Sequence, residues 1–278
     1  MRISEFNDRI RRGKVSLDGG TARFIQEAGL PPEECAGSWI FEHPQPLMAL
    51  QRAYAAAGCD IVCAPTHTVR RAILEAHGLA DQIIRMNAGL VALSREAVEG
   101  RALIAGAVAS GKVRGPLDRD GRRAMFDAFR EQFVVIAAAA ADLLAAEPMD
   151  TVETAVCAAE AARDACGLPV MCALSAKAGG QLQDGSSAAE AAKALAAAGA
   201  CAVGLVCNAG PDGLSDAVAA MKDAGISLMV RAGAGVFLGP EAYAEAMLKL
   251  AEAGADVLGG CGGAGPEHMA ALVKAIRG

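Results

Sequence analysis

The segment LAEAGADVLG, residues 250–259, decides the fold, because a single glycine joins the end of an apolar helical face to a short buried run. Glycine at this position is the left-handed cap that ends a helix and lets the chain turn back into a parallel strand. The arrangement recurs in AYAAAGCDIV (53–62), LAAAGACAVG (195–204) and MKDAGISLMV (221–230). This repetition predicts helices that alternate with parallel strands.

Eight short apolar runs, each bounded by Gly, Asp or Pro, are the candidate strands around these junctions. They cover residues 14–17, 60–63, 102–107, 142–146, 169–174, 201–206, 227–230 and 256–258. Segments with helical period follow at 46–57, 80–99, 122–140, 151–166, 188–198, 213–223, 240–253 and 266–276. Eight repeats in one chain favour closure into a (β/α)8 barrel of the TIM type over an open sheet. We therefore expect an α/β fold, with residues 1–278 as one barrel domain.

The composition agrees with strands that are covered by helices. Apolar residues make up 53% of the chain and aromatic residues only 4%, so Ala, Val, Leu and Ile must form the core. The formal charge of -6 argues against nucleic acid or an anionic membrane as a partner. The charged N-terminal segment is unlike a secretory signal, and no run reaches the ~18 apolar residues of a membrane span. We expect a cytoplasmic protein whose nine scattered cysteines form no disulfides.

The functional residues of a (β/α)8 barrel lie at the C-terminal ends of its strands. The segments after the predicted strands contain two carboxylates, one histidine and two cysteines, namely Asp18, Glu147, His67, Cys207 and Cys261. Each has an ordinary structural alternative, such as packing for a cysteine or a turn for an aspartate before two glycines. Their convergence on one end of the barrel favours a functional site.

The glycine-rich segments after the last two strands support a second interpretation. VRAGAG (230–235) and GGCGGAG (259–265) could cradle a phosphate, with help from Arg231 and from the N-terminus of the last helix. This interpretation gives no role to the segment CNAGP (207–211) after the sixth strand.

Four motifs of the chain resemble the homocysteine S-methyltransferase family. VSLDGG (15–20), AAGCDIVCAPTHT (56–68), GLVCNAGPDGL (204–214) and AGADVLGGCGGAGPEHM (253–269) match the family's DGG, AGxDxxxTxTF, GxNCxxGP and GGCCGTxPxH motifs in order and spacing. Glu147 also matches a glutamate at the end of the family's fourth strand. The resemblance covers nearly the whole chain, from about Val15 to the C-terminus.

The resemblance implies an enzyme that transfers a methyl group to a zinc-activated thiol and so converts homocysteine to methionine. In the family, three thiolates hold a zinc ion that deprotonates the acceptor thiol and keeps one coordination position open for it. Cys207 and Cys261 match two of these ligands, whereas Gly262 stands in place of the third. The family's carboxylate region at strands one and four binds the acceptor's amino group, which assigns substrate binding to Asp18, Gly19, Thr66 and Glu147.

The missing cysteine leaves two interpretations open. In the first, another residue completes the zinc site; His67 is the strongest candidate because imidazole suits zinc, and Asp18 and Glu147 are the others. In the second, the barrel is free of zinc and binds an amino acid, a phosphate or a corrinoid protein, with altered or no methyl transfer.

The methyl donor is not defined by any motif. The chain carries neither a corrinoid-binding signature nor a second barrel for folate, so a methylcorrinoid or methylfolate donor implies a separate partner protein. Few aromatic residues are available to wall a cationic methyl donor, which favours delivery by such a partner.

Overall fold

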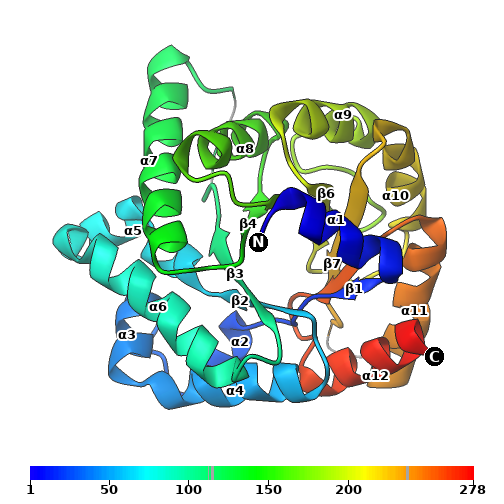
Figure 1. Ribbon diagram of the computed structural model, residues 1–278, viewed down its shortest axis with the longest axis horizontal. Coiled ribbons are helices and arrows are strands. Elements are labelled where there is room, and N and C mark those ends of the chain that lie inside the picture. Colours follow the sequence, from blue (N-terminus) through cyan, green and yellow to red (C-terminus); the bar gives the residue numbers. More distant parts are fainter. Residues whose placement is uncertain (112, 114–115, 236–237) are drawn as a thin grey trace.

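Eight parallel strands form one sheet in the computed structural model, which describes residues 1–111, 113, 116–235 and 238–278 (Figure 1). The strands are β1 (Val15–Ser16), β2 (Ile61–Ala64), β3 (Leu103–Val108), β4 (Leu143–Met149), β5 (Val170–Ser175), β6 (Ala202–Cys207), β7 (Ser227–Ala232) and β8 (Val257–Gly260). Their order is β1-β8-β7-β6-β5-β4-β3-β2. A bridge between Leu17 and Ile61 joins the two outer strands. The predicted (β/α)8 barrel is confirmed.

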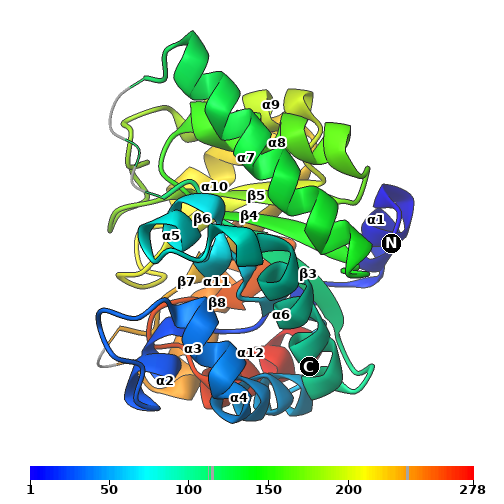
Figure 2. The same cartoon turned by 90° about the vertical axis from the view of Figure 1, so that its left-hand side faces the viewer.

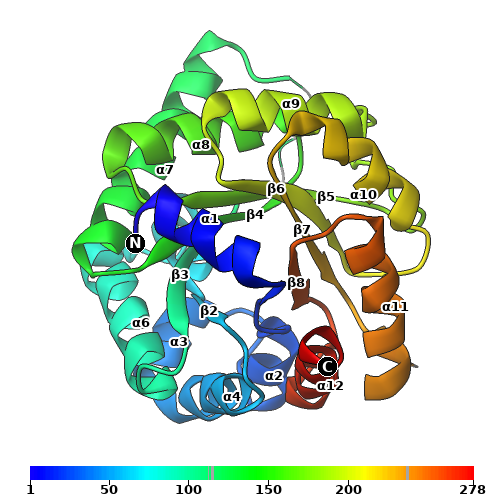
Figure 3. The same cartoon turned by 45° about the vertical axis from the view of Figure 1, so that its right-hand side comes forward.

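Helices surround the sheet on its outer side (Figure 3). The helices that follow the strands are α4 (Pro44–Ala56), α6 (Ile83–Val98), α7 (Arg119–Ala138), α8 (Val152–Ala165), α9 (Ala188–Ala198), α10 (Ser215–Met221), α11 (Pro240–Ala253) and α12 (Pro266–Arg277). All eight were expected from the sequence, and only their ends differ. None of the described helices is both long and apolar enough to cross a bilayer.

Four helices were not predicted: α1 (Ile3–Arg12), α2 (Ala22–Glu27), α3 (Ala36–Glu42) and α5 (Arg71–Ala76). Three of them are short, and half of the residues of α1 are charged. In α1 a single side chain, Phe6, is buried, and it packs into the barrel interior. Figure 2 shows α1 at one end of the barrel, opposite the loops that follow the strands. The opposite, C-terminal end is therefore left for the functional site.

Side chains alternate along the strands between two cores. On β6, Val203, Leu205 and Cys207 belong to the layer between sheet and helices, while Ala202 and Val206 belong to the barrel interior. Much of the interior is alanine, including Ala105, Ala107, Ala145 and Ala173. Such small side chains leave room at the C-terminal end for long polar ones.

Candidate active site

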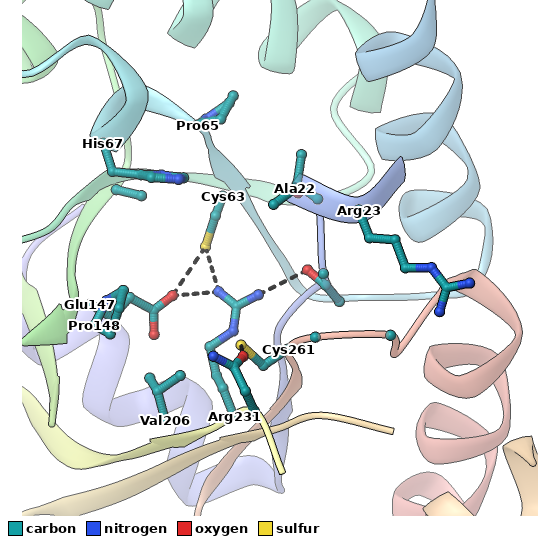
Figure 4. Close-up of a pocket in the computed structure, with 17 residues that line it drawn as sticks. Ala22, Arg23, Cys63, Pro65, His67, Glu147, Pro148, Val206, Arg231 and Cys261 are labelled. Atoms are coloured by element: carbon teal, nitrogen blue, oxygen red, sulfur yellow. Dashed lines mark hydrogen bonds and ion pairs between the residues drawn. The ribbon is translucent and has the colours of Figure 1, made fainter. Parts of the chain in front are cut away.

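A cavity of about 270 Å³ opens at the C-terminal end of the barrel (Figure 4). It is lined by the segments that follow β1, β2, β6 and β8, together with residues near the C-terminal ends of β2, β3, β4, β6 and β7. The polar and thiol side chains that the site's chemistry depends on are Cys63, His67, Glu147, Asn208, Arg231 and Cys261. Three of these, Cys63, Asn208 and Arg231, had no role in the methyltransferase assignment made from the sequence.

Arg231 of β7 lies at the centre of this site and is only 8% exposed. Its Nε donates to the Gly260 carbonyl oxygen at 2.9 Å, and its Nη2 donates to Asp18 Oδ1 at 2.9 Å. Its Nη1 donates to Glu147 Oε1 and, at 3.2 Å, to Cys63 Sγ. Burial alone would lower the pKa of Arg231, but the two carboxylates raise it above its ordinary value. The guanidinium is a permanent cation, and acceptors of the chain itself take its N–H groups. Arg231 is therefore not free to bind a phosphate, as the phosphate interpretation requires.

Asp18 is fully buried behind the cavity and does not line it. Its Oδ1 accepts from Arg231, and its Oδ2 accepts from the backbone N–H of Cys63 at 2.8 Å. Burial raises the pKa of Asp18, while the Arg231 guanidinium opposes that shift. Both oxygens accept hydrogen bonds from within the chain. Asp18 therefore positions Arg231 and β2, whereas the sequence had predicted that it contacts the substrate.

Gly19 does line the cavity, and its carbonyl oxygen accepts from Arg231 at 3.0 Å. A Cβ at this position would lie 2.1 Å from the carbonyl oxygen of Ala264. Glycine is therefore required by the close approach of two backbone segments.

Glu147 has one carboxylate oxygen that the protein does not use. The register of β4 against β5 shifts between Ala146 and Met149, a bulge that places Glu147 at the rim of the interior. The residue is 7% exposed and lines the cavity. Oε1 accepts from Arg231, whereas Oε2 is buried without a hydrogen-bond partner in the described chain. An unpaired buried carboxylate oxygen is costly, which points to a donor group supplied by a ligand.

His67 lies in the one-turn helix Thr66–Val69 and lines the cavity opposite Cys261 (Figure 4). Gln132 fixes this turn by donating from Nε2 to the Thr66 carbonyl oxygen at 2.7 Å. The Thr66 hydroxyl donates to the Ala107 carbonyl oxygen at 2.6 Å. Thr66 is buried and does not line the cavity. It therefore holds the loop in place, whereas the sequence had predicted that it contacts the substrate. Burial and the positive charge of Arg231 lower the pKa of His67 to about 4, so its imidazole is neutral at pH 7.

Of the three predicted zinc ligands, His67 and Cys261 line the cavity and Cys207 does not. Cys261 lines the cavity and donates from Sγ to Asn208 Oδ1 at 2.8 Å. Cys207 is fully buried in the layer that faces the helices and does not line the cavity. Cys63 contributes the other cavity thiol, and burial raises the pKa of both Cys63 and Cys261. The physical reason for the difference is strand alternation, which turns Cys207 away from the interior.

The donor set does not fit a catalytic zinc ion. Such an ion takes three protein ligands and keeps one position open. In the part of the chain that the structure describes, no three His, Cys, Asp or Glu side chains gather in a way that could hold a metal. The expected set of Cys207, Cys261 and His67 is therefore not assembled, and neither Asp18 nor Glu147 completes it.

The low pKa of His67 predicts a pH-dependent contribution to stability. Between the folded pKa of about 4 and the ordinary value of about 6.5, the unfolded chain binds more protons than the folded one. The contribution of neutral His67 is thus complete above pH 6.5 and is lost as the pH falls toward 4, by up to about 3 kcal/mol. We expect His67→Gln to remove it. Urea unfolding of both proteins across this range checks the prediction, and a constant difference between the two curves would contradict it.

Comparisons with known proteins agree with this architecture. The family model described as homocysteine S-methyltransferase matches residues 15–276. Betaine–homocysteine S-methyltransferase 1 of Xenopus laevis is 32% identical over 235 residues, which cover 81% of this chain and 57% of that protein. Methionine synthase of Mycobacterium leprae is 24% identical over 288 residues, covering 93% of this chain and 24% of that protein. The chain thus spans a little over half the length of the first relative and about a quarter of the second.

A solved structure shares the fold over nearly the whole chain. The metallated form of the homocysteine methyltransferase MmuM from Escherichia coli superposes with a TM-score of 0.80 at 21% identity. The match covers 94% of this chain and 95% of that one.

Proposed function

The chain belongs to the homocysteine S-methyltransferase family, and from that premise we propose that it transfers a methyl group to the sulfur of homocysteine in the cavity at the C-terminal end of the barrel. The reaction forms an S–CH3 bond and yields methionine. The names of the similar proteins support this choice of acceptor, because both the betaine-dependent relatives and MmuM carry homocysteine in their names.

The unpartnered Oε2 of Glu147 is the observation that supports an amino-acid acceptor most directly. Two carboxylates, Asp18 and Glu147, surround the single guanidinium of Arg231. When both carboxylates are ionised, this group carries one excess negative charge beside the cavity. The ammonium group of homocysteine would donate to Oε2 and balance that charge. Arg231 and Asp18 would act by holding Glu147 and the β2 backbone in position.

The sulfur of the acceptor would then lie in the part of the cavity lined by Cys261, Asn208 and His67. These groups are uncharged at pH 7, which suits a thiol that is only about 3% ionised there. Methyl transfer is an in-line displacement, and holding both ends of the acceptor supplies much of the rate by alignment. The zinc ion typical of the family would ionise the acceptor thiol, but the ligands present do not fit such an ion.

The cavity lining favours a methyl donor that a partner protein delivers. No Phe, Tyr or Trp is among the cavity-lining residues of the described chain, whereas Arg23 and Arg231 are. A quaternary ammonium donor is usually held by aromatic faces, which this lining does not offer. The similarity to methionine synthase supports a corrinoid or methylfolate-binding partner for this chain.

An assay with several donors tests the proposed function. The purified protein is incubated with L-homocysteine and, in separate reactions, with methylcobalamin, betaine or a methylsulfonium compound, and methionine is measured by mass spectrometry. We expect methionine above the protein-free rate with methylcobalamin, and little with betaine. Absence of product with every donor, together with no effect of homocysteine on the melting temperature, would contradict the proposal.

A further inference from the structure

Arg231 engages the thiol of Cys63 at the cavity. The Arg231 guanidinium donates to Cys63 Sγ at 3.2 Å, and the carboxylates of Asp18 and Glu147 hold it on two other sides. Arg231 is nine-tenths buried, so this charge is poorly screened by water. Arg231 thus engages Cys63, a thiol that lines the cavity, so this sulfur is not free to bind a metal.

Asn208 takes the place beside Cys261 where a further ligand would lie. Cys261 Sγ donates to Asn208 Oδ1 at 2.8 Å, so the thiol has an acceptor in its protonated form. A Cβ at Gly262 would lie 3.2 Å from the same oxygen and 3.7 Å from Asn208 Cγ. The carboxamide of Asn208 therefore lies in the space that a side chain at position 262 would need.

Only one of the two expected family ligands reaches the cavity. Cys207 is fully buried against the helix-facing core, and its neighbours Val206 and Asn208 line the cavity instead. Cys63 and His67 also line the cavity, but among the described residues no three such side chains gather as the three ligands that a catalytic zinc requires.

From these contacts we propose that the chain methylates its thiol acceptor without a protein-bound zinc ion, with Arg231 holding Cys63 and Asn208 holding Cys261 as a neutral thiol. The methyl-transfer part rests on the proposed function, whereas the zinc-free site does not. In the reaction, the acceptor sulfur bonds to the donor's methyl carbon, and the donor–methyl bond breaks with its electron pair left on the donor. The acceptor's thiol proton passes to water.

Zinc content tests this inference without any methyl donor. Wild type, Gly262→Cys and the matched control Gly262→Ala are purified under reducing conditions, saturated with zinc and dialysed. We expect less than about 0.1 equivalent of zinc in wild type and in Gly262→Ala. Gly262→Cys adds one thiol beside Cys261, while Cys207 faces the helices and Arg231 engages Cys63, so we expect it also to retain less than about 0.1 equivalent and to show no thiolate–cobalt absorption with Co²⁺. Circular dichroism shows whether each variant is folded.

Two results would overturn the inference. One is about one equivalent of zinc in wild type that is lost in Cys261→Ala. The other is about one equivalent of zinc in a folded Gly262→Cys protein, because Cys207 or Cys63 would then be free to complete a metal site. A zinc-free wild type that fails to make methionine would refute the proposed function alone, and a zinc-containing active one would refute this inference alone.

Discussion

Arg231→Met is expected to lower the free energy of unfolding by about 3–5 kcal/mol, because it leaves buried carboxylates without their cation. Asp18 is fully buried and Glu147 is 7% exposed, and Arg231 pairs with both. Methionine replaces the aliphatic part of the arginine side chain and carries no charge, so the loss reports the missing guanidinium. Urea unfolding at pH 7 measures it.

The matched control is an ion pair at the surface. Arg130 pairs with Asp164 on neighbouring helices, and both side chains are about half exposed. We expect Arg130→Ala to cost at most about 1 kcal/mol, because water screens such pairs. If Arg231→Met does not fold, the variant that also carries Asp18→Asn and Glu147→Gln should fold, since it removes the unpaired charges. A loss for Arg231→Met no larger than that of the control would contradict the central role of Arg231.

Glu147→Gln is expected to raise the dissociation constant of homocysteine by about two orders of magnitude, as for a buried charge pair that loses one partner. Glutamine keeps the shape and can still accept from Arg231 through Oε1. Its amide N–H groups would then face the acceptor's ammonium, where the wild type presents the free Oε2. Isothermal titration calorimetry with L-homocysteine measures the change.

Asp150→Asn is the matched control for this titration. Asp150 directly follows β4 and accepts from the Ser175 hydroxyl at 3.2 Å, but it does not line the cavity. We expect this variant to bind homocysteine within a few-fold of wild type. Equal weakening by both variants would indicate a general loss of negative charge at the mouth and would argue against a direct contact with Glu147.

The fold could be predicted from the sequence because its signals are local. A glycine cap followed by a short apolar run recurs at helix–strand junctions, and every predicted strand has its counterpart in the barrel. The predicted strands mostly began one residue too early, since Asp60, Asp142 and Asp256 precede the paired residues and accept from neighbouring backbone or side chains instead. Helices α1, α2, α3 and α5 were missed because they are short or bury little, so their apolar period is weak.

The site could be predicted only in part, because its contacts are set by tertiary structure. Strand ends placed Gly19, His67, Glu147 and Cys261 at one cavity, as expected. Asp18 accepts a hydrogen bond from Arg231, which is 213 residues away in the sequence, and no local pattern shows that pairing. One signal was present, however: a single arginine in the apolar run SLMVRA must find buried acceptors.

The motif around Cys207 also did not show which way its side chain points. Its motif matches the family, yet strand alternation places it in the helix-facing layer with Val203 and Leu205. Counting residues along β6 from Val206, which faces the interior, would have given this orientation.

The claim that the cavity binds an amino-acid thiol through Glu147 is tested most directly by titrating the wild-type protein with L-homocysteine and with 4-mercaptobutanoate, which lacks only the amino group. The account predicts that the second compound binds about two orders of magnitude more weakly, and that Glu147→Gln abolishes this difference. Equal affinity of the wild-type protein for the two compounds would contradict it.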